Sequence, residues 1–514
     1  MDTNMKNVIA LLALSLLVAC GGEQSPPPDT TAQEEDLHAS DLKQEPVAGG
    51  RYLIAGRCEA QFDDELAQKA QRYERTWHLL SAGTMGLNTD VGVGFGNQEG
   101  RDKFCDFIAN HTGWDFEEFA GFPAADLINS HNKATGLYAG VGLAADAFRY
   151  GVYRDQGYEA SEIDIAREQL LRGLAGLRIA IDITGTEGVV ARSILLRTGY
   201  EEQMPETMPL FDEEGAPPPT EKSNGTWRDD NSVDGSCSDY VWEDSISRDQ
   251  ILGWVTAIAA SWEVLRDDDS FDQSLKDRLQ GDARTLGKAL MKIGDSGYDL
   301  EIPDADGRVT LHGYLNEHNL EGMYFEVLEN GFHSVMALGI VSAYAYVSED
   351  EEISAFLYDQ LIEERKLHEI VNKNLHMIDN GTGSNYSVYN MAFHSIWLAL
   401  RYVEHEEALN TLREALQLEL YARPDEQNQP IDLNYALYDL VYAAGTAGIN
   451  VFGPASSEGD GAILNKAILN LQLFPDAPYW NYAAINCPEL ECDCENKDVE
   501  ESACIGLDGV TEFN

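Results

Sequence analysis

Apolar residues recur at helical spacing along most of this chain, and this pattern constrains the fold more than any other feature of the sequence. In the stretch 249–265 the apolar positions follow one another at steps of three and four, which places them on one face of a helix. They are Ile251, Trp254, Val255, Ile258, Trp262 and Leu265. The same spacing predicts further helices over 131–150, 161–182, 186–198, 274–293, 331–347, 351–375, 385–404, 405–421, 433–444 and 461–473.

Strand signals are scarce by comparison. The best candidate is the short run 308–312, which follows a turn at Asp306-Gly307. The sequence therefore predicts an all-α body.

Small residues suggest how these helices pack. The stretch 136–145 contains Gly136, Gly140 and Gly142 within seven positions, although each glycine costs a helix about 1 kcal/mol relative to alanine. Such glycines favour close approach of neighbouring helices. Longer loops also alternate with short ones, which is typical of an α/α toroid, where inner and outer helices alternate and the long loops gather on one face.

Two motifs carry a resemblance to a known family. The run 182–188 is followed by Ala191-Arg192, and the run 242–250 precedes a predicted helix that contains Gly253. Both resemble stretches of six-hairpin, (α/α)6-barrel glycosidases and polysaccharide lyases, over about residues 130–445. The resemblance implies the toroid fold, but it does not imply a particular reaction, because that fold also hosts epimerases and non-catalytic members.

The N-terminus indicates export. An apolar run from Val8 to Val18 ends in Leu17-Val18-Ala19-Cys20 and is too short to span a bilayer. This resembles the signal and lipobox of bacterial lipoproteins, which implies cleavage before Cys20 and acylation of its thiol, palmitate included. Gly21 permits sorting to the outer membrane, so we expect a lipid-anchored protein of the cell envelope, periplasmic or surface-exposed.

The chain divides into four parts on this interpretation. Residues 1–19 are the signal peptide, 20–50 a lipidated and disordered tether, 51–484 the toroid body and 485–514 a short Cys-rich segment. The formal net charge of −54 repels nucleic acid and anionic lipid headgroups, so neither is an expected partner.

Cysteine usage fits an oxidising compartment. We expect disulfides within the C-terminal segment, because the spacing of its four cysteines matches no familiar zinc site. They are Cys487, Cys492, Cys494 and Cys504. Cys58 with Cys105 is a second candidate pair, which would leave Cys237 over.

Asp249 is the first candidate catalytic residue. It stands at a helix start, where Ser247 and Gln250 match a capping box, and this structural role alone could explain the segment. Residues that resemble Asp249 lie at the cleft in family members that cleave glycans, which implies a general acid or base. Trp242 nearby could offer a ring on which a sugar stacks.

The segment 312–333 is the richest in polar chemistry. We expect Glu317 or His318 to be the catalytic partner of Asp249, and His312 to contact substrate. Two alternatives stay open. The segment could hold a metal, or its histidines could only form local hydrogen bonds.

A third cluster lies at the start of the helix predicted over 385–404. Tyr389, Asn390 and His394 are spaced for one helix face and would line a sugar site, although packing is the commoner role of such a stripe. Arg192 could bind a substrate carboxylate or pair with a nearby acid.

Calcium is a weak candidate cofactor. The run 230–235 offers oxygen ligands from Asp230 and Asp234, but Val241 stands where an EF-hand loop has its glutamate. A shorter candidate is 304–307, and acidic loops arise by chance in so acidic a chain.

These observations predict a lipoprotein that binds and cleaves a polysaccharide or oligosaccharide, as a hydrolase or a lyase. The main rival hypothesis is a non-catalytic lipoprotein that binds a glycan or a protein. A metal-dependent hydrolase would require His312, His318 and an acid to converge.

Overall fold

The computed structural model describes residues 57, 62–82, 86–89, 91–93, 128–131, 133–197, 204–217, 225–379, 385–423, 429–446 and 457–474. This part of the chain is mostly helical and is compatible with an α/α toroid. Its helices are α2 (Asp64–Thr76), α5 (Gly136–Asp155), α6 (Ala160–Asp182), α7 (Arg248–Leu265), α8 (Gln273–Leu290), α9 (Gly331–Ser348), α10 (Glu351–Ala355), α11 (Leu367–Asn374), α12 (Tyr386–Tyr402), α13 (Glu406–Ala415), α14 (Ala436–Thr446) and α15 (Ser457–Leu473).

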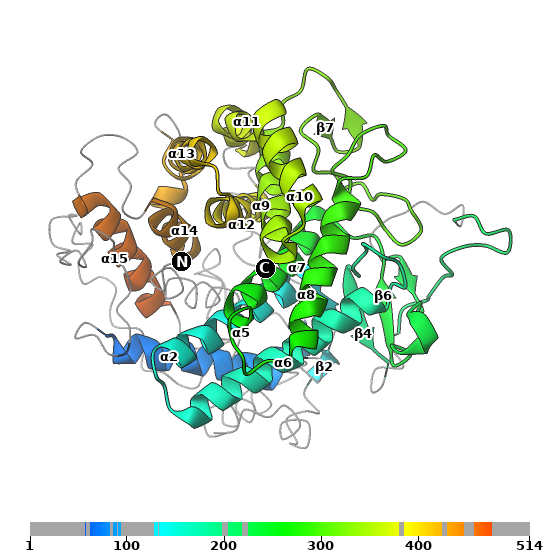
Figure 1. Ribbon diagram of the computed structural model, residues 1–514. Helices are drawn as coiled ribbons and strands as arrows, with labels where there is room; N and C mark the ends of the chain where they lie inside the picture. The colour runs from blue at the N-terminus through cyan, green and yellow to red at the C-terminus, as the bar shows by residue number, and fades with distance from the viewer. Residues whose placement is uncertain are drawn as a thin grey trace, which may run out of the picture.

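The helices follow one another around the molecule in chain order. Figure 1 shows α5 and α6 followed by α7 and α8, then α9 and α11, α12 and α13, and finally α14 and α15. Within this arrangement α5 packs against α7, α7 against α9, α9 against α12, and α12 against α14. These five helices form an inner series that the remaining helices flank.

The closest contact in the inner series joins α5 to α7. A Cβ on Gly140 would lie 2.1 Å from the carbonyl oxygen of Gly253, so the two backbones touch there without side chains between them. Further along, Gly151 lies against Val264. The two contacts advance together along both helices, which shows that α5 and α7 run in the same direction.

The N-terminal ends of the other inner helices also lie next to one another. The guanidinium of Arg248, the first residue of α7, lies 3.2 Å from the imidazole of His333 near the start of α9. The hydroxyl of Tyr438 near the start of α14 donates a hydrogen bond of 2.8 Å to Asn390 near the start of α12. The N-termini of the inner helices therefore gather at one end of the molecule.

Helix α9 is the core helix of the series. Its 18 residues are apolar enough to cross a membrane by length and composition, but 89% of them are buried inside the protein. Tyr346 near its end stacks on Tyr402 near the end of α12, with ring centroids 4.5 Å apart. This burial on all sides explains why α9 is apolar around its whole circumference.

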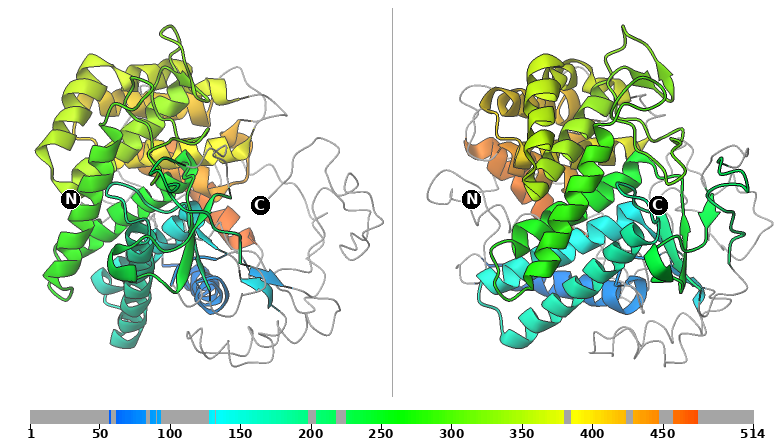
Figure 2. Two further views of the ribbon diagram at one scale, coloured as in Figure 1. Left: turned by 90° about the vertical axis from the view of Figure 1, so that its right-hand side faces the viewer. Right: turned by 45° about the vertical axis from the view of Figure 1, so that its right-hand side comes forward.

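A small antiparallel sheet covers the N-terminal ends of α5 and α7. Its strand order is β3 (Ala134–Thr135), β4 (Ser193–Leu196), β6 (Tyr240–Glu243) and β5 (Trp227–Arg228). It lies on the right-hand side of Figure 1, which faces the viewer in the left view of Figure 2. Strand β3 runs directly into α5, and β6 leads to α7 through residues 244–247. Two further pairs, β1 (Val91–Val93) with β2 (Ile128–His131) and β7 (Asn319–Leu320) with β8 (Met323–Tyr324), are also antiparallel.

Helix α2 connects the two ends of the series. Lys69 of α2 donates a hydrogen bond of 2.7 Å to the carbonyl of Gln472 at the end of α15. Trp77, in the π-helical turn η3 (Trp77–Ser81) that follows α2, packs so closely on α5 that a Cβ on Gly142 would meet its ring at 2.0 Å. A second apolar cluster joins α2, α14 and α15.

Three sequence predictions of secondary structure were wrong. The described part of the predicted helix 186–198, residues 186–197, contains β4 and no helix, because Ser193–Leu196 pairs with β6. The run 308–312 forms no strand, since its groups bond to residues 246–248 instead. The stretch 351–375 is broken into α10, the π-helical turns η7 (Phe356–Glu364), and α11.

Several further predictions lie outside the described residues. These are the signal peptide 1–19, the lipidation at Cys20, the tether 20–50, the segment 485–514, and the cysteines Cys58, Cys105, Cys487, Cys492, Cys494 and Cys504.

The α5–α7 contact gives a test of the fold. We expect Gly140→Ala to lower the free energy of unfolding by about 1–3 kcal/mol, because overpacking two backbones outweighs the gain of about 1 kcal/mol in helix propensity. Gly281→Ala in α8 is the matched control, because a Cβ at this position would meet nothing within 4 Å. This substitution should stabilise the protein, because alanine has less backbone entropy to lose on folding than glycine. Denaturant unfolding followed by circular dichroism measures both, and equal stability of the two variants would contradict the proposed contact.

Candidate functional site

Two of the predicted site residues, Asp249 and His312, lie at the N-terminal turn of α7. Strand β6 and residues 244–247 deliver the chain to this turn, and the backbone N–H of Arg248 donates a hydrogen bond of 3.0 Å to the carbonyl oxygen of His312. Asp249 and His312, far apart in sequence, therefore lie at the same helix end. Both side chains are at least partly exposed.

Asp249 is held by its two sequence neighbours. Its Oδ1 accepts a hydrogen bond from the hydroxyl of Ser247, and its Oδ2 accepts one of 2.9 Å from Nε2 of Gln250. The amide oxygen of Gln250 accepts a hydrogen bond of 2.8 Å from the backbone N–H of Leu137 in α5. The expected capping box does not form, because these side chains bond to Asp249 and to α5 in preference to the helix backbone.

The buried Glu243 is linked through Arg192 to Ser247, which holds Asp249. Arg192 donates a hydrogen bond of 2.6 Å to Ser247 and forms an ion pair of 3.5 Å with Glu243. Glu243 also accepts hydrogen bonds of 2.8 Å from Lys133 and 2.9 Å from Ser193. Arg192 therefore pairs with an internal acid, which was the alternative to binding a substrate carboxylate.

A second series of hydrogen bonds runs from His333 through Arg248 and Glu321 to His312. Arg248 donates a hydrogen bond of 2.7 Å to Oε1 of Glu321, and Oε2 of Glu321 accepts one of 2.8 Å from Nδ1 of His312. On its other side, Arg248 donates to Nε2 of His333. The side chain of His312 is 49% exposed, and its Nε2 has no partner among the described residues.

The charge state of Glu321 follows from these contacts. Burial raises its pKa, but the hydrogen bond and charge of Arg248, together with His312, outweigh this effect and leave the pKa below its ordinary value. The carboxylate can therefore orient the imidazole of His312, with the ring N–H at Nδ1 directed to Glu321.

The backbone at Glu321 is unusual for a glutamate. Glu321 has φ of 46° and Gly322 has φ of 87°, which makes the two-residue turn between β7 and β8 one of the type that asparagine and glycine prefer. A residue with a Cβ costs about 1–2 kcal/mol in this conformation. Strain of this kind at a polar cluster favours a functional role for the side chain.

Glu317 does not present a free carboxylate. Its Oε1 accepts a hydrogen bond of 2.7 Å from Arg365, its Oε2 accepts a second from the same guanidinium, and only 3% of the residue is exposed. Arg365 also binds Asp299 at 2.8 Å. His318 donates from Nδ1 to the carbonyl of Leu328 at 2.7 Å. The predicted catalytic partner Glu317 therefore anchors its loop to the end of η7.

The third predicted cluster is only partly accessible. Tyr389 is buried, and its hydroxyl accepts a hydrogen bond of 3.1 Å from Arg423. Asn390 is partly buried and bonds to Tyr438. His394 is partly buried and forms no hydrogen bond with the described residues, while burial lowers its pKa to about 4. His394 is thus a neutral imidazole at physiological pH.

Trp242 was expected at the sugar site and is instead fully buried. Its exposed fraction is 0%, and its indole N–H donates a hydrogen bond of 2.8 Å to the carbonyl of Asp229. Trp242 lies in β6, between β4 and β5, and pairs with Ile194 on one side and Arg228 on the other. It cannot stack on a substrate there.

The calcium candidates serve the loops in which they lie. The two oxygens of Asp230 accept hydrogen bonds from the backbone N–H groups of Ser232 at 2.8 Å and Cys237 at 3.1 Å. Asp234 is exposed on the same turn. Among the described residues no group of three His, Cys, Asp or Glu side chains is arranged to hold a metal ion.

The sequence did not single out Arg248, Glu321 or His333 for these roles. Arg248 and Glu321 are separated by 73 positions. A signal existed only at Glu321-Gly322, where a glycine follows an acid between two short β-prone pairs, and it is too weak to identify a hairpin by itself.

Comparison with protein-family models and with curated proteins finds no match. Among solved structures, the chain is similar to a cellobiose 2-epimerase from Bacillus thermoamylovorans B4167, with 12% sequence identity and a TM-score of 0.25, over 68% of this chain and 73% of that chain. At this TM-score the likeness carries no argument about fold or activity.

A substitution at His333 tests the series of hydrogen bonds that ends at His312. Burial, aided by the charge of Arg248, lowers its pKa to about 4. The unfolded chain takes up a proton near pH 6.5 and the folded chain only near pH 4, so stability falls as the pH falls between these values, by up to about 1.4 kcal/mol per pH unit.

We expect His333→Gln to remove the contribution of His333 to this slope, because glutamine is neutral at every pH and can still bond to Arg248. Urea unfolding of both proteins from pH 7.5 to pH 4.5 measures the difference. Parallel stability curves for the two proteins would show that the pKa of His333 is not lowered by folding.

Proposed function

We propose that this protein is a glycan-processing enzyme of the cell envelope, with Asp249 and His312 as its acid and base pair. The hydrogen bond between the backbone groups of Arg248 and His312 carries this proposal, because it brings the two accessible titratable side chains to one helix end. Each of them is oriented by a further polar group, Asp249 by Ser247 and His312 by Glu321.

The pair has the groups that glycan cleavage needs. Hydrolysis requires one group to protonate the leaving oxygen and another to activate water or stabilise the sugar cation. β-Elimination requires a base that removes the proton next to a uronate carboxylate. His312 can donate or accept a proton at Nε2, while the Asp249 carboxylate serves as the second group. The role expected for Glu317 or His318 passes to His312 in this proposal.

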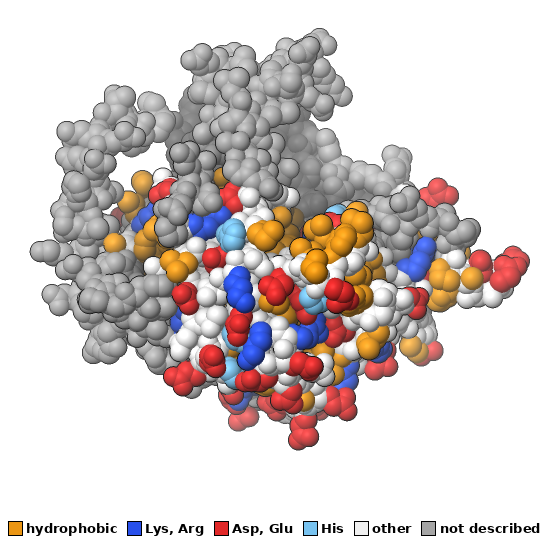
Figure 3. Space-filling model, turned by 90° about the horizontal axis from the view of Figure 1, so that it is seen from above, with side chains coloured by type: hydrophobic (Ala, Val, Ile, Leu, Met, Phe, Trp, Pro, Cys, Tyr) orange, Lys and Arg blue, Asp and Glu red, His pale blue; other side chains and the backbone are white. Residues whose placement is uncertain are grey.

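Apolar side chains next to the pair suit a sugar ring. Leu311 adjoins His312, and Leu320 and Met323 flank the turn that holds Glu321, each about half exposed. Phe325 and Val327, which follow β8 in the chain, are also exposed. Figure 3, seen from the end that carries α11 and β7, shows hydrophobic side chains gathered beside acidic and histidine side chains. The apolar faces of pyranose rings pack on surfaces of this kind.

Two broader proposals accompany this one. The inner helices would form a closed α/α toroid, an arrangement supported by the contacts of α2 with both α5 and α15. The lipobox-like sequence at Cys20 would tether that body to a membrane. A hydrolase, a lyase and a non-catalytic glycan binder stay distinct outcomes of experiment.

We expect the purified protein to release new reducing ends from at least one member of a glycan panel. Absorbance from unsaturated uronates together with reducing ends would indicate a lyase, and reducing ends alone a hydrolase. Asp249→Asn and His312→Gln should each lower turnover by about 100-fold to 10,000-fold, the usual contribution of a general acid or base.

The exposed residue Asp239 offers a control, since Asp239→Asn makes the same chemical change at a position before β6 that forms no part of the proposed pair. Turnover that survives both Asp249→Asn and His312→Gln would refute the assignment. Binding of a glycan without any cleavage, unaffected by either substitution, would favour the non-catalytic binder.

A further inference from the structure

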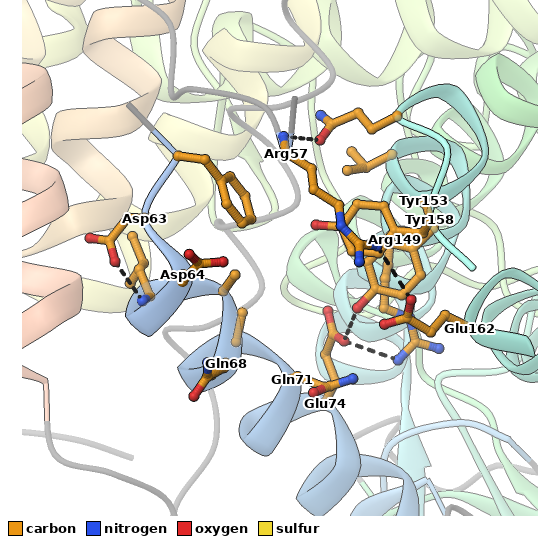
Figure 4. Close-up of a pocket in the computed structure, with 16 residues that line it drawn as sticks. Arg57, Asp63, Asp64, Gln68, Gln71, Glu74, Arg149, Tyr153, Tyr158 and Glu162 are labelled. Atoms are coloured by element: carbon orange, nitrogen blue, oxygen red, sulfur yellow. Dashed lines mark hydrogen bonds and ion pairs between the residues drawn. The ribbon is translucent and has the colours of Figure 1, made fainter. Parts of the chain in front are cut away.

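A cavity of about 240 Å³ lies between α2 and the C-terminal turns of α5, with the start of α6 beside it (Figure 4). It is at the opposite end of α5 from the site described above, because its α5 residues are Arg149, Val152 and Tyr153, while Leu137 contacts Gln250 near Asp249. A ligand held here would therefore occupy a separate site.

Glu74 is the central polar group of this cavity. Its side chain is 23% exposed, and a single oxygen, Oε2, takes both of its hydrogen bonds, from Arg149 at 3.4 Å and from the hydroxyl of Tyr153 at 3.3 Å. Both are longer than the 2.7–2.9 Å of a good charge-assisted bond. The other oxygen, Oε1, accepts no hydrogen bond from the described residues. Figure 4 shows Glu74 reaching from α2 toward Arg149 and Tyr153.

The wall formed by α2 is acidic and rich in amides. Gln71, one turn before Glu74, is partly buried and makes no hydrogen bond with the described residues. Gln68 and Asp64 line the same wall. Gln68 and Asp64 are exposed and Gln71 is partly buried, so this wall offers donors and acceptors that a ligand can contact.

The cationic groups of the cavity are already engaged. The guanidinium of Arg57 lies 4.2 Å from the ring centre of Tyr158 and 3.4 Å from Glu162. Arg149 pairs with Glu74 and, at 3.7 Å, with Asp146. The lining holds four carboxylates, Asp63, Asp64, Glu74 and Glu162, against these two arginines.

We propose that this cavity binds a compact organic cation through a primary ammonium group seated against Glu74 and Gln71. An ammonium supplies three donors and one positive charge, which match Oε1 of Glu74, the carbonyl oxygen of the Gln71 amide and the excess of carboxylates. An anion would meet that excess unfavourably, and a neutral polyol would leave it uncompensated. Burial raises the pKa of Glu74, and the charge and hydrogen bond of Arg149 offset this effect only in part.

Two matched pairs of small molecules test the proposal by isothermal titration calorimetry. Glucosamine differs from glucose, and ethanolamine from ethylene glycol, by an ammonium group in place of a hydroxyl. We expect at least one amine to bind about ten-fold or more tightly than its hydroxyl counterpart, as loss of one charged hydrogen bond implies. Equal binding within both pairs, or no binding of either amine, would overturn the proposal.

Variants place the ammonium group in the cavity. Glu74→Gln keeps the shape and removes the charge, so it should weaken the amine by about ten-fold or more, and Gln71→Ala should weaken it less. Glu168→Gln, at an exposed position of α6, removes the same charge outside the cavity and should leave binding unchanged. Melting curves by circular dichroism confirm that each variant is folded.

A last variant separates the two sites. Asp249→Asn should retain amine binding, because Asp249 lies at the other end of the inner helices. Loss of binding in Asp249→Asn, or undiminished binding in both Glu74→Gln and Gln71→Ala, would assign the amine to another place and refute the cavity as its site.

Discussion

The contact between the glycine backbones of α5 and α7 is the constraint on which the candidate site depends. Without side chains at Gly140 and Gly253, the two helices approach until their backbones touch, and their N-terminal turns meet. That approach lets Gln250 reach the backbone of Leu137, and the same Gln250 then holds Asp249. A packing feature of the helix interior therefore orients a carboxylate at the helix end.

Pairing of buried charges is the second organising feature. The chain has 35 basic residues against 89 acidic ones. Four arginines of the described residues are buried, namely Arg149, Arg228, Arg248 and Arg423. Arg228, fully buried, binds both Asp244 and Asp306 at 3.0 Å, which places a guanidinium where the sequence had suggested a calcium site. Internal arginines of this kind satisfy carboxylates that burial would otherwise make costly. The surface is left acidic, and the interior is held by specific pairs.

The sequence predicted the helices well and their chemistry less well. Apolar periodicity located α6 to α9, α12, α14 and α15 to within about four residues, because one face of each helix is buried. Helix α5 lies five residues later than the predicted 131–150, and α13 ends at Ala415, before the predicted end at 421. It mistook 186–198 for a helix, since a buried strand and a buried helix segment share the same apolar residues and only pairing with β6 decides between them. Trp242 and Glu317 were expected at a site, but neighbours distant in sequence cover the first and pair with the second.

By itself, the sequence determined the helical class, the close approach indicated by its glycines, and the helix start beside Asp249, because spacing and local residue type express these properties. Only the tertiary structure decided which groups lie together. His312 joins Asp249 through a backbone hydrogen bond, Glu321 reaches His312 from a strained turn, and Glu74 faces a cavity between two helices. Contacts between residues dozens of positions apart depend on how the helices pack, so they cannot be predicted from a local sequence pattern.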